Sequence, residues 1–206
     1  MASESPCSAD VVVPVPDSGV PAALGYAEAA GLPFELGIIR NHYVGRTFIE
    51  PQQSTRDFGV KLKHNINRDA VNGKRVVLID DSIVRGTTSI KIVELMRQAG
   101  AREVHMKIAS PPIKYPDFYG IDTPDKSQLL ASFKSEKEMT EYIGADSLSF
   151  LSVDGLYRAM GHKQGRDNTN PAFTDHCFTG DYPTPLKDNN VEWLFETSQL
   201  SVRNEN

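Results

Sequence analysis

Apolar runs of strand length alternate with helix-length amphipathic stretches over the first 110 residues, and this alternation constrains the fold more than any other feature. Such a pattern is typical of β-α-β units, in which successive strands pair in parallel and helices cover the sheet. We therefore predict an α/β fold with a doubly wound, mainly parallel sheet. Four runs are expected to form strands: Val11–Val15, Glu35–Arg40, Arg75–Asp80 and Glu103–Ser110.

Helices are expected between these strands. Val20–Ala30 is rich in alanine and ends before Gly31, while Thr87–Ala99 has helical spacing of its apolar residues and ends before Gly100. Glycine directly after a helical stretch is a common helix stop. A third helix is predicted over Gln53–Asn65, although it contains a glycine.

The character of the chain changes after residue 110. Several prolines break the alternation, and short helical pieces are expected at 125–132, 135–143 and 152–160 as a C-terminal helical covering segment. Residues 162–185 are rich in Gly, Asn and Pro and show no periodicity. We therefore expect three parts: a leader at 1–10, the main domain at 11–160, and a loop-rich C-terminal extension and tail at 161–206.

Charge and hydropathy exclude several classes of protein. The chain has 22 basic and 27 acidic residues, a net charge of −5, and no basic stripe, so no nucleic-acid partner is expected. No apolar run approaches the roughly 20 residues that cross a bilayer, so no membrane partner is expected. The N-terminus lacks a secretory pattern, which favours a cytoplasmic location with Cys7 and Cys177 as free thiols. His176 and Cys177 next to Asp175 leave a zinc site as a weak alternative.

The most informative stretch is V-V-L-I-D-D-S-I-V-R-G-T-T-S at 76–89. A buried strand ends in Asp80 and Asp81, and a loop containing Gly86 then opens a helix. Ligands of open α/β sheets bind at the carboxyl ends of strands, and a helix N-terminus offers free N–H groups to phosphate. Two carboxylates suit ribose hydroxyls or Mg²⁺. The Walker and dinucleotide patterns are absent, and a simple turn with a helix cap would leave the paired acids unexplained.

The stretch I-D-D-S-I-V-R-G-T-T-S resembles the phosphoribosyl pyrophosphate (PRPP) signature of type I phosphoribosyltransferases, and its wording is similar to that of the amidophosphoribosyltransferase family. The similarity continues through further motifs: P-V-P-D-S-G-V-P-A-A at 14–23, R-N-H-Y-V-G-R-T-F-I at 40–49, V-K-L-K-H-N at 60–65, F-Y-G-I-D-T-P at 118–124, I-G-A-D-S-L-S-F-L-S at 143–152 and F-T-G-D-Y-P-T at 178–184. The resemblance implies the type I phosphoribosyltransferase fold. It also implies formation of 5-phosphoribosylamine and pyrophosphate from PRPP and ammonia, the first step of de novo purine biosynthesis.

The resemblance also implies roles for individual residues. Asp80 and Asp81 would hold the ribose hydroxyls and, with Ser18, lie nearest Mg²⁺. Arg46 and Thr47 would be catalytic together with Asp80 and Asp81, and they would lie on a flap over Arg40–Gln53 that closes over the substrate. The remaining substrate-binding positions would be Asp17, Ser18 and Gly19 for the pyrophosphate, and Ser82, Val84, Arg85, Gly86, Thr87, Thr88 and Ser89 for the 5′-phosphate. From the residues alone, a plain turn at Asp17 and a solvated loop around Arg46 stay open as alternatives.

The sequence departs from the family in two respects. The family's glutaminase domain, with its N-terminal cysteine nucleophile, is expected to be absent, since Cys7 lies in a short polar leader; amination would then use free ammonia. Some members carry an iron–sulfur cluster, whose cysteine positions read Asp117, Thr174 and Cys177 here, so no cluster is expected.

The resemblance implies the partners as well. We expect PRPP and ammonia as substrates, purine nucleotides as inhibitors, and assembly into a homo-oligomer. Two other functions remain open from the sequence: a non-catalytic module that binds PRPP or a nucleotide, and an inactive fragment.

Overall fold

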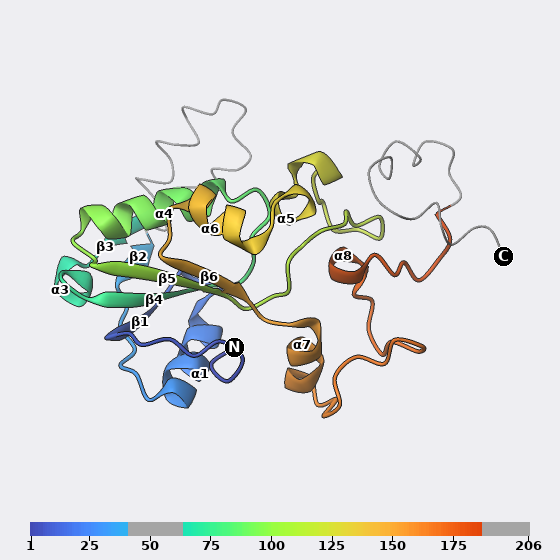
Figure 1. The fold of residues 1–206 in the computed structure, drawn as a ribbon, viewed down its shortest axis with the longest axis horizontal. Coiled ribbons are helices and arrows are strands. Elements are labelled where there is room, and N and C mark those ends of the chain that lie inside the picture. Colours follow the sequence, from blue (N-terminus) through green and yellow to red (C-terminus); the bar gives the residue numbers. More distant parts are fainter. Residues whose placement is uncertain (41–63, 187–206) are drawn as a thin grey trace.

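A four-stranded parallel sheet lies at the centre of the computed structural model, which describes residues 1–40 and 64–186. Its strand order is β1-β4-β5-β6, with every neighbouring pair parallel (Figure 1). This confirms the predicted α/β fold with a mainly parallel sheet. The four strands are β1 (Val11–Pro14), β4 (Arg75–Asp80), β5 (Glu103–Ile108) and β6 (Ser147–Phe150).

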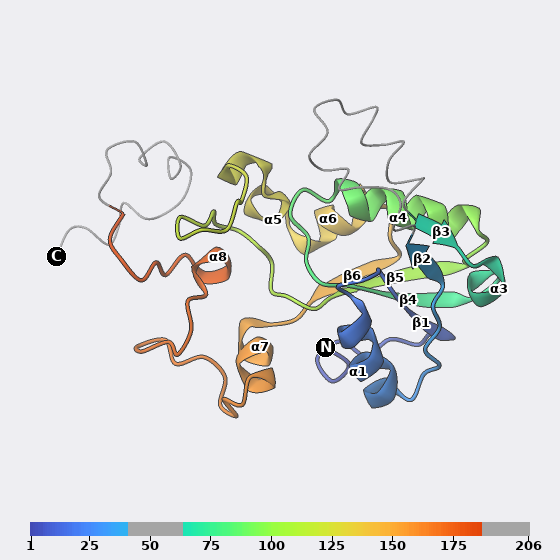
Figure 2. The same cartoon turned by 180° about the vertical axis from the view of Figure 1, so that it is seen from behind.

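Helices cover both faces of this sheet (Figures 1 and 2). Helix α1 (Val20–Ala30) lies on one face, and α4 (Thr87–Gln98) and α6 (Glu136–Ile143) lie on the other. Helix α1 ends where Gly31 adopts φ 64°, a left-handed conformation that glycine adopts without strain. The start of α6 is fixed by a capping box between Ser135 and Glu138.

The side chains on the two faces of β4 pack into two separate hydrophobic cores. Val76 and Leu78 pack with residues of α4 and α6, whereas Val77 and Ile79 pack with α1 residues such as Tyr26. Because both faces of the strand are buried, its sequence reads as a continuous apolar run and not as an alternation. This burial is what fixes the position of the strand's carboxyl end.

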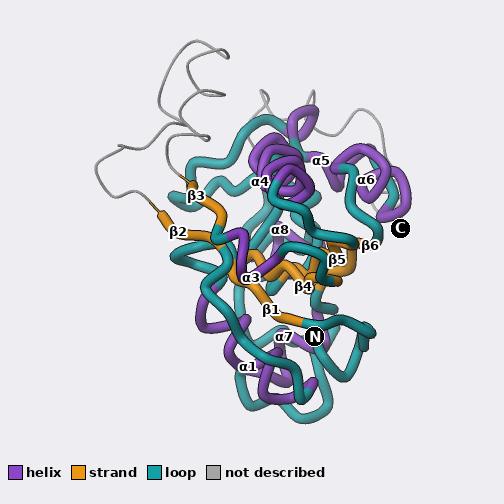
Figure 3. The backbone as a smooth tube through the Cα atoms, turned by 90° about the vertical axis from the view of Figure 1, so that its left-hand side faces the viewer, coloured by secondary structure: helices purple, strands orange, loops and turns teal. Residues whose placement is uncertain are grey.

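A second, two-stranded antiparallel sheet is formed by β2 (Ile38–Arg40) and β3 (His64–Ile66) (Figure 3). The expectation that Glu35–Arg40 joins the parallel sheet holds only where this segment begins, since Phe34 forms a parallel bridge with Val12 and the Glu35 N–H donates to the Val12 carbonyl at 3.0 Å. It is wrong for Ile38–Arg40, which pairs antiparallel with β3. The predicted helix over Gln53–Asn65 is wrong at its last two residues, which lie in β3. The rest of that helix lies outside the described residues. Ile38 is buried while Ile39 is 55% exposed, the alternation typical of a strand with one wet face. The short helix α3 (Arg68–Val71) follows β3.

The C-terminal half contains the expected short helices, together with one helix and one strand that were not predicted. The expected helices are the 3-10 helix η2 (Lys126–Gln128), α5 (Leu130–Phe133), α6 and α7 (Val153–Ala159). Helix α8 (His176–Thr179) lies in the stretch for which no periodicity was found. Strand β6 was not predicted, because its alternating polar and apolar residues, S-L-S-F, are a weak signal within a helical context. No helix in the described ranges has the length and apolar character needed to cross a membrane.

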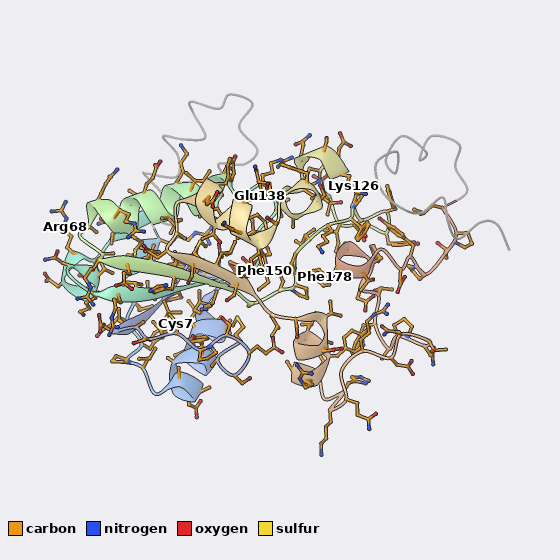
Figure 4. The ribbon with its side chains drawn as sticks, viewed as in Figure 1. Cys7, Arg68, Lys126, Glu138, Phe150 and Phe178 are labelled. Atoms are coloured by element: carbon orange, nitrogen blue, oxygen red, sulfur yellow. The ribbon has the colours of Figure 1, made fainter. Side chains whose placement is uncertain are left out.

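The first residues of the chain pack beneath the sheet on the α1 face, where Cys7 is labelled in Figure 4. The Glu4 carboxylate accepts hydrogen bonds from the Ser152 N–H (3.0 Å) and hydroxyl (2.8 Å) and from Arg158 (2.6 Å). Ser152 is the N-cap of α7, so Glu4 ties the N-terminal segment to the start of that helix.

Residues 162–186, which we call the extension, are organised around one buried arginine. Arg166 donates to the Asp175 carboxylate at 2.6 and 3.1 Å and to Asp181 at 2.7 Å. The hydroxyls of Tyr157 and Thr179 also donate to Asp175. These bonds outweigh the effect of burial and hold the pKa of Asp175 below its ordinary value. The extension is therefore centred on a satisfied polar network, which we call the Arg166 hub.

Candidate functional site

The loop between β1 and α1 packs directly against the end of β4. A Cβ atom at Gly19 would lie 2.5 Å from the Ile79 carbonyl oxygen and 2.7 Å from that of Val15, so only glycine fits there. Asp17 and Ser18 are exposed beside it, and the Pro16–Asp17 peptide bond is cis. No side chain caps the N-terminus of α1. The Val20 N–H donates to the Asp17 carbonyl at 3.3 Å and Pro21 has no N–H, so in this first turn the Ala22 N–H is the one that no described residue accepts.

Arg40 at the end of β2 forms an ion pair with Asp17. The sequence analysis placed Arg40 at the start of the predicted flap and did not connect it with Asp17. Opposite charge was the only available signal, and it could not by itself identify the partner. The pair brings a guanidinium next to the first loop, where an anionic group would otherwise meet only the Asp17 carboxylate.

Asp80 and Asp81 end β4 in contrasting environments. The Asp80 side chain is buried, with 6% exposure, and its Oδ1 accepts the Asp81 N–H at 2.9 Å; Asp81 is exposed. Burial, reinforced by the neighbouring Asp81, raises the pKa of Asp80 to about 8. Within the described ranges no cationic side chain pairs with either carboxyl group. A buried carboxyl without a cation next to an exposed one fits a site for Mg²⁺, which takes one or two carboxylates and keeps its waters.

The loop over residues 82–86 leads from this acid pair into α4. Gly86 adopts φ 77° as the N-cap, with no side-chain capping bond. Thr87 and Thr88 are exposed, whereas Ser89 is buried. The N–H of Ile90 is the first to reach back to Gly86, so the three N–H groups before it have no partner within the helix. Together with the positive end of the helix dipole, these donors suit a phosphate group.

Both loops lie at one edge of the sheet because β1 and β4 are neighbours. The Val15 N–H donates to the Ile79 carbonyl at 2.7 Å, extending the pairing to the very end of both strands. The predicted positions from Asp17 to Gly19 and from Asp80 to Ser89 therefore come together. Arg46 and Thr47 lie outside the described residues. The arrangement offers two helix N-termini for two phosphate groups, with the acid pair at the end of the same strand pair.

A second polar cluster lies far along the chain, where Asp117 Oδ1 and His176 Nε2 are 2.7 Å apart and Cys177 is adjacent. Burial and the Asp117 carboxylate raise the pKa of the Cys177 thiol to about 11. One protonated thiol does not fit an iron–sulfur cluster, which needs several thiolates. Asp175, which the zinc alternative required beside His176, is instead engaged by Arg166. We assign this cluster a structural role in joining the 117–123 loop to α8.

Comparison with known proteins gives consistent matches. Residues 3–109 match the family model described as "Phosphoribosyl transferase domain". The chain is 67% identical over 193 residues to the amidophosphoribosyltransferase of Rhizobium etli, covering 93% of this chain and 39% of that protein. It is 58% identical over 183 residues to amidophosphoribosyltransferase 1, chloroplastic, of Arabidopsis thaliana, covering 89% and 31%. The chain thus spans about a third to two fifths of the length of these relatives.

A solved structure agrees with the fold and the sequence. The glutamine PRPP amidotransferase of Bacillus subtilis complexed with ADP and GMP superimposes with a TM-score of 0.80 at 56% identity, covering 91% of this chain and 41% of that one. This agreement over 91% of the chain supports the parallel-sheet fold described above.

Proposed function

Since the chain belongs to the phosphoribosyltransferase domain family, we propose that it binds PRPP with Mg²⁺ at the carboxyl edge of its sheet and transfers the phosphoribosyl group to ammonia. The bond between ribose C1 and the pyrophosphate oxygen breaks, and pyrophosphate leaves with the electron pair. The ammonia nitrogen bonds to C1 and gives up a proton. The products are 5-phosphoribosylamine and pyrophosphate.

The observation that carries this proposal is that two loops, each leading into a helix, follow the carboxyl ends of the neighbouring strands β1 and β4, and that β4 ends in the acid pair. The loop over Asp17–Gly19 would hold the pyrophosphate, and residues 82–89 would hold the 5′-phosphate. Ser18, Asp80 and Asp81 would hold Mg²⁺, which when bound neutralises charge on the departing pyrophosphate. Asp80 and Asp81 would also bind the ribose hydroxyls. No side chain needs to act as a nucleophile, so rate enhancement would come from positioning and electrostatics.

Water must be kept from C1 while oxocarbenium character develops. We assign this task to the flap over Arg40–Gln53, with Arg46 and Thr47 closing on the pyrophosphate. An arginine placed there would stabilise the charge that builds up on the leaving group.

The nitrogen donor in this proposal is free ammonia. Burial raises the pKa of both the Cys7 and the Cys177 thiols, so neither is activated to attack glutamine. The Bacillus subtilis relative was solved with ADP and GMP. By analogy we propose purine nucleotides as inhibitors of this chain and a homo-oligomer as its assembled state.

The test is pyrophosphate release from PRPP and Mg²⁺, measured in parallel with ammonium chloride at alkaline pH and with glutamine. We expect release with ammonia and none with glutamine. Silence with both, combined with saturable PRPP binding, would instead indicate a binding module. Silence with no binding would overturn the assignment of the site.

A further inference from the structure

Three consecutive residues of the loop between β4 and α4 are each held by the short helices that pack outside it. The Leu130 N–H donates to the Val84 carbonyl at 2.8 Å. Arg85 Nε donates to Gln128 Oε1 at 2.9 Å. Over Gly86 the space is filled, since a Cβ there would lie 2.7 Å from Leu130 Cδ2 and 3.4 Å from Tyr142 Cε1.

These outside contacts hold the loop together with Ile83, whose side chain is buried in the core. In the part of the chain that the structure describes, the bond from Leu130 is the one backbone hydrogen bond that reaches residues 82–85. For the Arg85 side chain, Gln128 is likewise the one hydrogen-bond partner among the described residues. A loop with so few bonds of its own takes its geometry from its surroundings.

The surrounding helices are themselves well fixed. Leu130 is buried in the same core as α4, and the Ser132 hydroxyl donates to the carbonyls that precede α5. Tyr142 is 45% exposed, but Lys134 Nζ lies 5.4 Å from its ring centroid. Figure 4 labels Lys126, where η2 begins, and Glu138 on α6, which bracket this region.

We propose that Gln128, Leu130 and Tyr142 form a brace that positions the loop over residues 82–86, which we call the phosphate loop. The brace thereby sets the affinity of this loop for the 5′-phosphate of the substrate. The inference rests on the proposed function. These residues are positioning residues, because they contact the loop from outside. Gln128 holds one edge of the Arg85 guanidinium. Leu130 and Tyr142 pack over Gly86 and keep it in the conformation that leaves the first N–H groups of α4 accessible to an anion.

The brace acts on one of the two phosphate loops, and this gives it a distinctive signature. The affinity for ribose 5-phosphate should fall when the brace is removed. The affinity for Mg²⁺–pyrophosphate, which the loop over Asp17–Gly19 would hold, should stay the same. A general loss of structure would weaken both ligands together.

The experiment measures the affinity of both ligands by calorimetry for the wild type, Gln128→Ala and Tyr142→Ala. We expect each variant to bind ribose 5-phosphate about tenfold more weakly, the effect of losing one hydrogen bond to a charged group or one packing contact, with pyrophosphate affinity unchanged. Gln128→Glu, which keeps an acceptor for Arg85, and Tyr142→Phe, which keeps the ring, should restore wild-type affinity. Gln98→Ala and Phe133→Ala are the matched controls, since both side chains are exposed on the neighbouring helices.

Wild-type affinity for ribose 5-phosphate in the alanine variants, or an equal loss for both ligands, would overturn the brace. Failure of the wild type to bind PRPP, ribose 5-phosphate or pyrophosphate would overturn the proposed function instead. Amide hydrogen exchange without ligand then decides the brace on its own: residues 83–90 should exchange faster in the alanine variants than in the controls, and equal exchange would refute it.

Discussion

The edge of the parallel sheet and the extension over residues 162–186 are ordered by different forces. At the sheet edge the backbone is fixed by apolar strands buried on both faces, and the first three N–H groups of α4 are left without a partner within the helix. In the extension, polar groups form the centre in place of apolar ones. The side chains of Arg166 and Asp175 are only 6% and 4% exposed, and Arg166 donates hydrogen bonds to Asp175 and Asp181.

The difference shows where binding capacity resides. A carboxyl group such as Asp175, already held by Arg166, Tyr157 and Thr179, has little to gain from a ligand. A carboxyl group such as Asp80, buried with no cationic partner among residues 1–40 and 64–186, is stabilised by a ligand that brings a cation. The candidate site therefore differs from the Arg166 hub in that its polar groups still have room for a ligand, while an apolar scaffold holds them in place.

The largest effect should come from Asp80→Asn, which tests the unsatisfied side of this comparison. We expect pyrophosphate release from PRPP to fall by about 100-fold or more, because the buried ligand for Mg²⁺ and ribose is lost. In metal-free buffer at neutral pH the same variant should melt at a higher temperature than the wild type, since the raised pKa of Asp80 makes the wild type take up a proton on folding, a cost that a neutral amide does not carry. Asp69→Asn, at an exposed position on α3, is the control for both measurements. A near-normal rate would remove Asp80 from the site.

Arg166→Ala tests the other region, the extension, whose polar groups are paired with one another. Removing one partner of a buried ion pair typically costs about 3–5 kcal/mol, because a charge is left buried and unpaired. We expect rapid proteolytic cleavage within residues 162–186 while the far-UV circular dichroism of the sheet is retained. Arg102→Ala removes an exposed arginine that lies 4.0 Å from Asp10 and should have little effect. Unfolding of the whole chain in one step would show that the two regions are not independent.

Acid should destabilise the extension before the sheet, without any substitution. The pKa of Asp175 is lowered in the folded chain, so its contribution to stability is complete above the ordinary aspartate pKa and is lost as the pH falls through the lowered value. Below about pH 4, the near-UV signal of Tyr157, whose hydroxyl donates to Asp175, should decay before the far-UV signal of the sheet. Coincident loss of both signals would contradict this order.

The smallest effect is expected from Glu4→Ala, which cuts the tie between the N-terminal segment and α7. Loss of this cap should cost about 1 kcal/mol, equivalent to a fall of roughly 2–4 °C in melting temperature for a chain of this size. Glu28→Ala, at an exposed position on α1, should leave the melting temperature unchanged. A larger drop for Glu4→Ala would mean that α7 supports the sheet as well as the extension.

The elements nearest the site could be predicted well from the sequence. Strand β4 and helix α1 were predicted with the bounds that the structure has, and α4 within one residue, because continuous apolar burial and glycine stops are local signals. The two phosphate loops follow directly from those elements. Their chemical roles remain predictions that the experiments above test.

What the sequence could not provide was the pairing of distant polar residues. Arg166 meets Asp175 and Asp181 within an aperiodic segment, and Asp117 meets His176 across a much longer stretch. Charge alone allows many such pairs, so only the folded chain selects among them. Gln128 and Tyr142 were missed for the same reason, since their contacts with the phosphate loop depend on tertiary packing.

The register of β1 with β4, in which Val11 lies opposite Val76, also governs when the site can form during synthesis. A nascent chain that has emerged only as far as α1 carries one phosphate loop and no acid pair. The second loop arrives with β4, and the site closes only when that strand inserts beside β1, a non-local step with a substantial loop-closure entropy. Formation of the proposed site therefore requires this one pairing, and a substitution that slows the pairing delays the site even when the final stability is unchanged.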